Sequence, residues 1–131
     1  MKARCGLSGI LLAAGALLTS GCAVIDSHQR VDGWPELKVV EHHVSTEEMR
    51  ERCIKYVGPL TTPEGCTLFY LDRGEAHIYV SKDFPSAFVL EHERMHAAGY
   101  DHLGSDNMAQ VLERWRARKE ARLRQAAAAG D

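Results

Sequence analysis

An uninterrupted apolar run stands near the start of the chain, directly after two basic residues. Lys2 and Arg4 precede residues 6–18, which read GLSGILLAAGALL and carry no charge. The run is shorter than the roughly 20 residues that a membrane-spanning helix needs. A basic start, a short apolar core and small residues after it are typical of a secretory signal peptide. We therefore predict that residues 1–21 are a signal peptide.

Small residues lead into a cysteine at the end of this segment, in the order Leu18-Thr19-Ser20-Gly21-Cys22. This pattern resembles the lipobox of bacterial lipoproteins. The resemblance implies that Cys22 is lipidated and becomes the mature N-terminus, so that a lipid anchor ties the chain to a membrane of the cell envelope, facing the periplasm. Ala23, by the same resemblance, favours the outer membrane. The alternative is an ordinary cleaved signal with an incidental cysteine.

Residues 22–35 are polar and irregular, and we predict a tether there. Residues 37–44 alternate loosely, as a strand does. Ser45 and Glu48 form a capping box, so a helix is expected to run to about Tyr56 and to stop at Gly58. Two further short strands, residues 67–71 and 76–80, are separated by a turn and predict a hairpin.

The C-terminal half has a helical pattern. One helix is expected from about Pro85 to Ala98, ending at Gly99. A turn at residues 103–107 leads to a last helix over residues 108–125, and residues 126–131 are predicted to be a disordered tail. The order β-α-β-β-α-α predicts one α+β domain over residues 36–125, with a small sheet that includes a hairpin.

Composition narrows the class of protein further. With 131 residues, 45% of them hydrophobic, the chain has room for one small domain. The formal net charge of −2 gives no basic signature, so no nucleic-acid partner is expected. Beyond Cys22, only Cys53 and Cys66 remain. In an oxidising compartment two such cysteines predict a disulfide, which would stabilise the fold by about 3 kcal/mol; two buried thiols are the alternative.

The candidate chemistry lies in residues 92–102, HERMHAAGYDH. His92 and His96 are one helical turn apart on one face, so both imidazoles can reach one metal ion. Glu93 lies beside that face without being a ligand, which is the arrangement of the HExxH motif. Gly99 allows the chain to turn back and bring His102 to the same ion. Three neutral histidines with an open fourth position are typical of catalytic zinc.

This stretch resembles the zinc-binding consensus of the metzincin metallopeptidases. The resemblance implies a minimal zincin-like domain that hydrolyses peptide bonds of a peptide or protein substrate. His92, His96 and His102 would bind zinc (Zn²⁺), and Glu93 would be the general base toward the water that zinc activates. The strand before the active-site helix, here residues 77–80, would bind substrate along the edge at residues 76–80.

Met108 is the candidate for the methionine-containing turn of the same family. Residues 105–108 precede the last helix, where metzincins have that turn. The alternative is a helix start capped by Ser105 or Asp106, with Met108 as an ordinary core residue.

Other interpretations stay open at this point. Glu113 or Glu120 would replace His102 as third ligand if the chain resembled gluzincins instead. A non-catalytic zinc-binding envelope lipoprotein, or a structural lipoprotein without metal, would need no open position. His42 and His43 point to opposite faces of their strand and are expected at the surface. His77 either lines the cleft or is a half-exposed strand residue.

Overall fold

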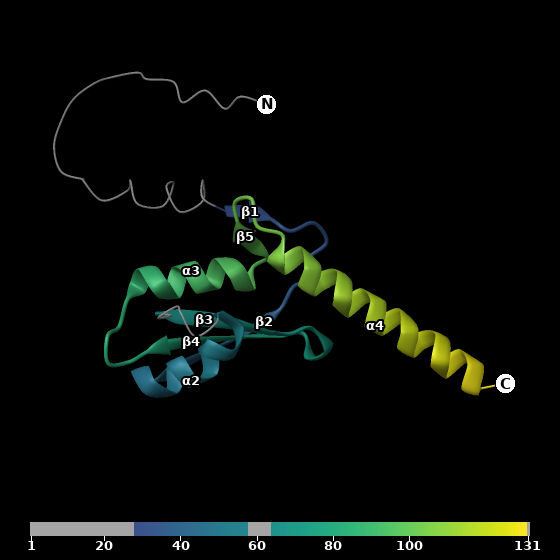
Figure 1. Cartoon of the computed structure of the whole chain (residues 1–131), viewed down its shortest axis with the longest axis horizontal. Helices are drawn as coiled ribbons and strands as arrows, with labels where there is room; N and C mark the ends of the chain where they lie inside the picture. Colours follow the sequence, from purple (N-terminus) through teal and green to yellow (C-terminus); the bar gives the residue numbers. More distant parts are fainter. Residues whose placement is uncertain (1–27, 58–63, 131) are drawn as a thin grey trace, which may run out of the picture.

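The computed structural model describes residues 28–57 and 64–130. The predicted signal peptide and Cys22 therefore lie outside the described residues. The elements in chain order are β1 His28–Arg30, β2 Lys38–Val44, α2 Thr46–Val57, β3 Gly65–Tyr70, the 3₁₀ helix η1 Leu71–Arg73, β4 Glu75–Ser81, α3 Ala87–Ala97, β5 Tyr100–His102 and α4 Asn107–Ala129. Helices and strands are mixed along the chain, which confirms the predicted α+β class (Figure 1).

A three-stranded sheet in the order β2-β4-β3 forms the centre of the domain. β3 and β4 are antiparallel and form the predicted hairpin, in which Gly74 adopts a left-handed φ of 67°. β2 pairs with β4 in parallel. β4 is therefore the central strand, with a neighbour on each side. The prediction that a substrate pairs along residues 76–80 is wrong, because the backbone of β4 is already hydrogen-bonded to β2 and β3.

A helix covers each face of this sheet. On one face Ala76 and Ile78 of β4 pack against Val89 and Ala97 of α3. On the other face Tyr79 packs in a cluster with residues of α2. This alternation along β4 is what a central strand requires, since its successive side chains point to opposite faces.

The disulfide Cys53–Cys66 links α2 to β3, with the two Cα atoms 5.7 Å apart. Both cysteines are buried, together with Met49 and Leu68. The predicted pairing of the two remaining cysteines is therefore present in the structure. The bond fixes the helix that covers the sheet face opposite α3.

The segment at residues 28–35, which we expected to belong to a tether, is part of the folded domain. β1 pairs with β5 in a separate two-stranded sheet. Val31 and Trp34 are buried in the core, and the Trp34 indole N–H donates to the carbonyl of Ala97 at 3.3 Å. A polar strand of three residues has no hydrophobic alternation, so the sequence pattern does not reveal it.

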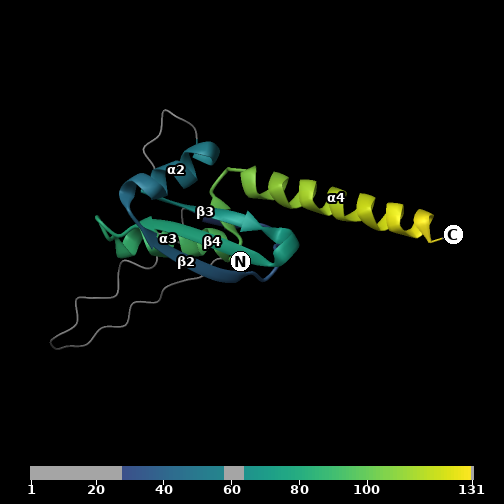
Figure 2. The same cartoon turned by 90° about the horizontal axis from the view of Figure 1, so that it is seen from below.

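The first turns of α4 pack on the domain, and Arg122 further along the helix forms an ion pair with Asp72 of η1. The C-terminal end of α4 projects beyond the sheet (Figures 1 and 2). Met108 and Leu112 are buried with Trp34 and Leu71. The helix continues to Ala129, so the predicted disordered tail is wrong for residues 126–129. Those four residues are alanines, which have the highest helix propensity. Among the described residues, none of the helices has both the length and the hydropathy needed to cross a membrane.

Candidate metal centre

α3 brings the first two predicted ligands together. His92 and His96 lie one turn apart near the C-terminal end of this helix, and their Nε2 atoms are 3.2 Å apart. Two nitrogen ligands at the usual zinc distance in a tetrahedral site are about 3.3 Å from each other. The helix alone therefore sets this pair at the spacing of ligands to a common ion.

The chain reverses directly after α3 and brings in the third predicted ligand. Gly99 has φ of 94°, and a Cβ there would lie 2.7 Å from the Trp34 ring, so the position requires glycine both for its backbone angle and for space. β5 follows at once and ends at His102. The His102 ring centroid is 5.0 Å from that of His92 and 4.8 Å from that of His96. The three histidines of the motif thus form one group.

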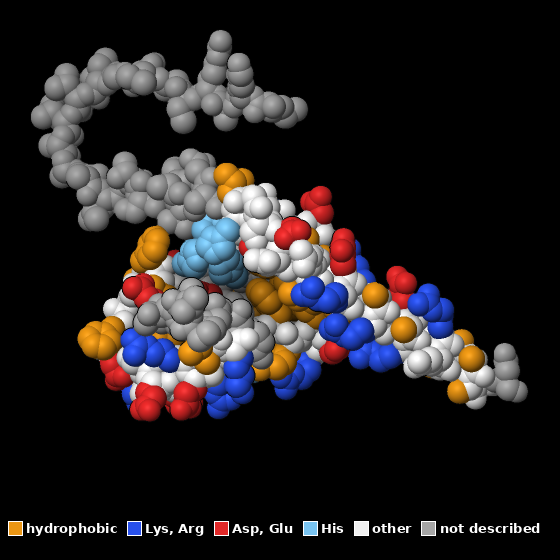
Figure 3. All heavy atoms as spheres, viewed as in Figure 1, with side chains coloured by type: hydrophobic (Ala, Val, Ile, Leu, Met, Phe, Trp, Pro, Cys, Tyr) orange, Lys and Arg blue, Asp and Glu red, His pale blue; other side chains and the backbone are white. Residues whose placement is uncertain are grey.

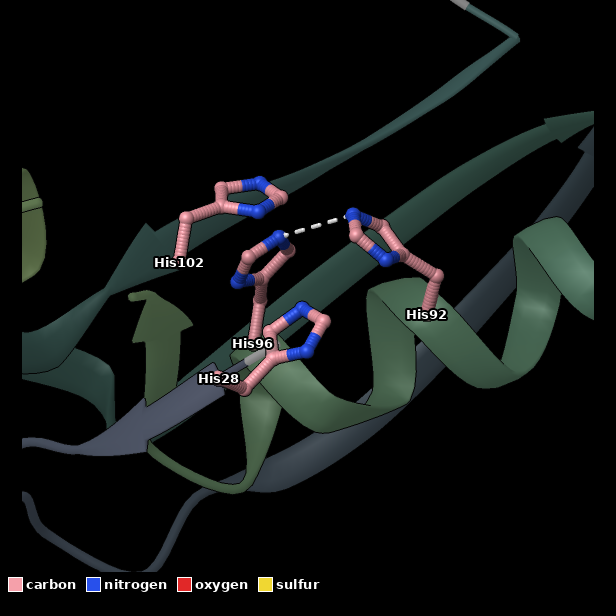
Figure 4. Close-up of side chains that lie close together, drawn as sticks. All are labelled: His28, His92, His96 and His102. Atoms are coloured by element: carbon pink, nitrogen blue, oxygen red, sulfur yellow. Dashed lines mark hydrogen bonds between the residues drawn. The ribbon is translucent and has the colours of Figure 1, made fainter. Parts of the chain in front are cut away.

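A fourth histidine, which sequence reasoning missed, completes the group. His28 of β1 lies opposite His102 in the β1–β5 pairing, and its ring centroid is 5.0 Å from that of His92. One ring nitrogen of each of the four histidines lies within 4.8 Å of the others (Figure 4). We call His28, His92, His96 and His102 the four-histidine cluster. His28 precedes the motif by a long stretch of sequence, and only the strand pairing places it there.

Hydrogen bonding and burial keep the cluster suited to a metal ion. Nδ1–H of His96 donates to the carbonyl oxygen of Tyr100 at 2.7 Å, which leaves its Nε2 lone pair directed at His92. Burial, and then the neighbouring histidines, lower the pKa of His92 to about 4. Burial likewise lowers the pKa of His96. Neutral imidazoles are good metal ligands, and a set of imidazole nitrogens in this arrangement can hold a transition-metal ion.

Glu93 lies next to the cluster but outside the set of four ligand atoms. Its side chain is buried, and the Thr67 hydroxyl of β3 donates to its Oε2 at 2.7 Å. Burial raises the pKa of this carboxyl, and the hydrogen bond from Thr67 opposes part of that effect. A buried carboxylate is costly unless it is hydrogen-bonded, so Thr67 is the residue that holds Glu93 in place.

A pocket of about 710 Å³ opens beside the cluster, between β3, α3 and the first turns of α4. Glu93 and three of the four histidines line one side. The other lining residues include apolar and polar side chains, among them Phe69, Met108, Val111, Gln110 and Arg114. Figure 3 shows the histidines at the surface, with hydrophobic side chains between them and α4. The site is thus accessible from solvent along this pocket, which has both apolar and polar walls.

Asp101 connects the cluster to α4, and no sequence motif marks it. The residue is 3% exposed; its Oδ1 accepts from the backbone N–H of His102 at 2.8 Å, and its Oδ2 accepts from that of Met108 at 2.9 Å. Met108 is the second residue of α4 and is buried in the core, although it also lines the pocket. Met108 therefore stands at a helix start, as the alternative interpretation had it, and not in a turn that precedes the helix.

The other candidates lie apart from the cluster. His42 and His77 are half-buried on the sheet face covered by α2, where the His42 ring stacks on Tyr79 and on His77, so His77 does not line the cleft. His43 is exposed, as are Glu113 and Glu120 of α4. The third-ligand role of a glutamate, as in gluzincins, has no support from this arrangement, because His102 is the residue that joins His92 and His96.

Comparisons with protein-family models, with curated proteins and with solved structures found no match to this chain. The functional conclusion therefore depends on the geometry of the site and on the motif.

Proposed function

We propose that this chain is a zinc-dependent metallopeptidase of the cell envelope, anchored by lipid at Cys22. The observation that carries the proposal is the position of Glu93. Its carboxylate is buried beside the four-histidine cluster, is held by Thr67 and faces the same pocket, yet it is not one of the four ligands. Hydrolysis requires a base positioned to take a proton from the attacking water, and Glu93 is placed for this role. Storage of a metal ion does not require such a carboxylate.

His92, His96 and His102 would hold the zinc ion. Zinc, when bound, supplies a Lewis acid that polarises a peptide carbonyl and makes water acidic enough to attack it. Thr67 occupies Oε2 of Glu93, so we assign Oε1 as the atom that takes the proton from the attacking water. Glu93 then gives this proton to the nitrogen of the leaving amine. Burial of Glu93 keeps bulk water away from the proton during the transfer.

The substrate would lie along β3. This strand is at an edge of the sheet, and its residues form one wall of the pocket next to Glu93. An extended peptide can add to such an edge through backbone hydrogen bonds. Phe69, Met108 and Val111 would then contact an apolar side chain near the cleaved bond. The substrate class that fits is an extended peptide or an unfolded segment of a protein.

The test compares glutamate-to-glutamine substitutions at two positions of α3. Glu93→Gln should retain zinc and lose hydrolysis of a mixed peptide library by about 10²- to 10⁴-fold, because general-base catalysis is removed while the histidines remain. Glu91→Gln is the matched control, since Glu91 is 65% exposed and pairs with Arg94. Its activity should equal that of the wild type. Unchanged turnover in Glu93→Gln would contradict the proposal.

A non-catalytic zinc-binding lipoprotein is the second candidate, and His28 is the observation that favours it. Four protein ligands are typical of closed zinc sites that do no chemistry. The candidate predicts stoichiometric zinc with no cleavage of the library by the wild type or by any variant of His28.

A further inference from the structure

His28 reaches the four-histidine cluster from a part of the chain unrelated to the motif. Its ring centroid lies 5.0 Å from that of His92, 5.6 Å from that of His96 and 5.1 Å from that of His102. The residue is 8% exposed, so its side chain is directed into the protein and not into solvent. Figure 4 shows its ring facing the other three.

A tetrahedral zinc ion has four positions, and catalysis requires that one of them be open. Three histidines come from α3 and β5, which the motif accounts for. With His28 in its observed place, the fourth position is also within reach of a protein nitrogen. We infer that His28 is a fourth metal ligand, which closes the site and keeps it latent until β1 moves away. The latency part of this inference rests on the proposed peptidase activity; the ligation part does not.

The attachment of β1 supports a movable ligand. In the part of the chain that the structure describes, residues 28–30 pair with β5 and with no other strand, and a ribbon of this kind is marginally stable by itself. The Gln29 amide adds one hydrogen bond, to the Ser105 carbonyl at 2.6 Å. The next residues are fixed much more firmly: the Val31 N–H donates to the Gly99 carbonyl at 2.8 Å, and Trp34 is buried. β1 can therefore leave β5 while Val31 and Trp34 stay in the core. Its displacement would remove His28 and leave the three motif histidines in place.

The test follows zinc affinity, access to the metal and activity in the full chain. His28→Leu places an apolar side chain of roughly similar size at this buried position, and leucine cannot bind metal. Leucine in place of the exposed His43 is the matched control. Zinc affinity is measured by competition with a chelator, and access by titrating the cobalt(II)-substituted protein with azide while following its visible absorption.

We expect His28→Leu to bind zinc at least about tenfold more weakly than the wild type, since a ligand is lost. The cobalt form of the variant should bind azide at least about tenfold more tightly, and its peptidase rate should rise by about tenfold or more. His43→Leu should match the wild type in all three. Zinc and azide affinities of His28→Leu that equal those of the wild type would overturn the inference.

The remaining outcomes separate the two proposals. If zinc and azide affinities shift as expected but neither protein cleaves peptides, His28 is a ligand and the peptidase proposal fails. If both proteins cleave at equal rates, His28 does not keep the site latent. The azide titration of the wild-type cobalt protein needs no variant at all: strong azide binding there would show an open position and overturn the closure by His28, even if His28→Leu did not fold.

Discussion

The molecule holds two groups of histidines, and the sheet separates them. The four-histidine cluster lies at the end of α3, whereas His42 and His77 lie on the face that α2 covers. His42 Nε2 and His77 Nδ1 are hydrogen-bonded at 3.0 Å, and His77 Nε2 lies 3.2 Å from a carboxylate oxygen of Glu75. Each ring nitrogen in those contacts faces a protein partner. In the four-histidine cluster, by contrast, one ring nitrogen from each of four histidines converges on a common point, all within 4.8 Å of one another.

The comparison shows what decides the chemistry of a histidine group. His42 and His77 come from adjacent strands and form a chain of hydrogen bonds that ends at Glu75. In His96, Nδ1–H instead donates to the Tyr100 carbonyl, so Nε2 remains available to a metal ion that the other histidines of the cluster also face. A histidine is suited to bind a metal ion when one ring nitrogen is hydrogen-bonded to a partner that fixes the tautomer. The other ring nitrogen must then point to the place where the remaining ligands converge. Proximity of the rings alone is not sufficient.

The largest expected effect tests this distinction directly. His96→Ala should lower zinc affinity by up to about a thousandfold, because the binding free energy of a structural zinc ion, about 10–16 kcal/mol, would be divided among the few histidines that hold it. His77→Ala removes a ring from the other group and should change zinc affinity by less than about threefold. Competition with a chelator of known affinity measures both. An equal loss in the two variants would show that the sheet does not separate the groups functionally.

The disulfide gives the next prediction, on stability. Replacing Cys53 and Cys66 together with alanine should lower the free energy of unfolding by about 3 kcal/mol, since the unfolded chain loses its cross-link. The bond fastens α2, on the face away from the four-histidine cluster. Zinc affinity should therefore stay within about threefold. Urea unfolding measures the first quantity, and unchanged stability with the cysteines removed would contradict the role of the bond.

Local patterns in the sequence predicted the parts of the fold that local interactions determine. The hairpin of β3 and β4, the helix α2 with its Ser45 capping side chain and the stop of α3 near Gly99 all follow from turn and cap chemistry. The three histidines of the motif are close together because α3 and the reversal at Gly99 require it. These residues interact with neighbours only a few positions away.

The parts that the sequence did not predict depend on contacts between distant segments. Because β2 pairs in parallel with β4, β4 is the central strand of the sheet. The edge strand next to the site is therefore β3. The pairing of β1 with β5 brought His28 into the cluster. Asp101, which fixes β5 to the start of α4, belongs to no motif either. Polar strands of three residues carry no periodicity, so only the tertiary structure reveals them.

The smallest expected effect concerns the protonation of His42, on the sheet face that α2 covers, and its influence on stability. Burial, and then the charges of His77 and Arg52, lower the pKa of His42 below its usual 6.5. As the pH falls below about 6.5, the unfolded chain takes up a proton at this position before the folded protein does. The free energy of unfolding contributed by His42 is therefore largest at neutral pH and decreases with acidification.

His42→Phe keeps the ring stacked on Tyr79, whose centroid is 4.4 Å away, and removes the titrating group. We expect the variant to lose less stability than the wild type between about pH 7.5 and 5.5, measured by urea unfolding of protein freed of metal with a chelator. Phenylalanine in place of the exposed neighbour His43 controls for the loss of a histidine from the same strand. A steeper loss in His42→Phe than in the wild type would mean that folding raises the pKa of His42. The pair would then favour the protonated form, because the hydrogen-bond chain to Glu75 would outweigh the burial of the ring.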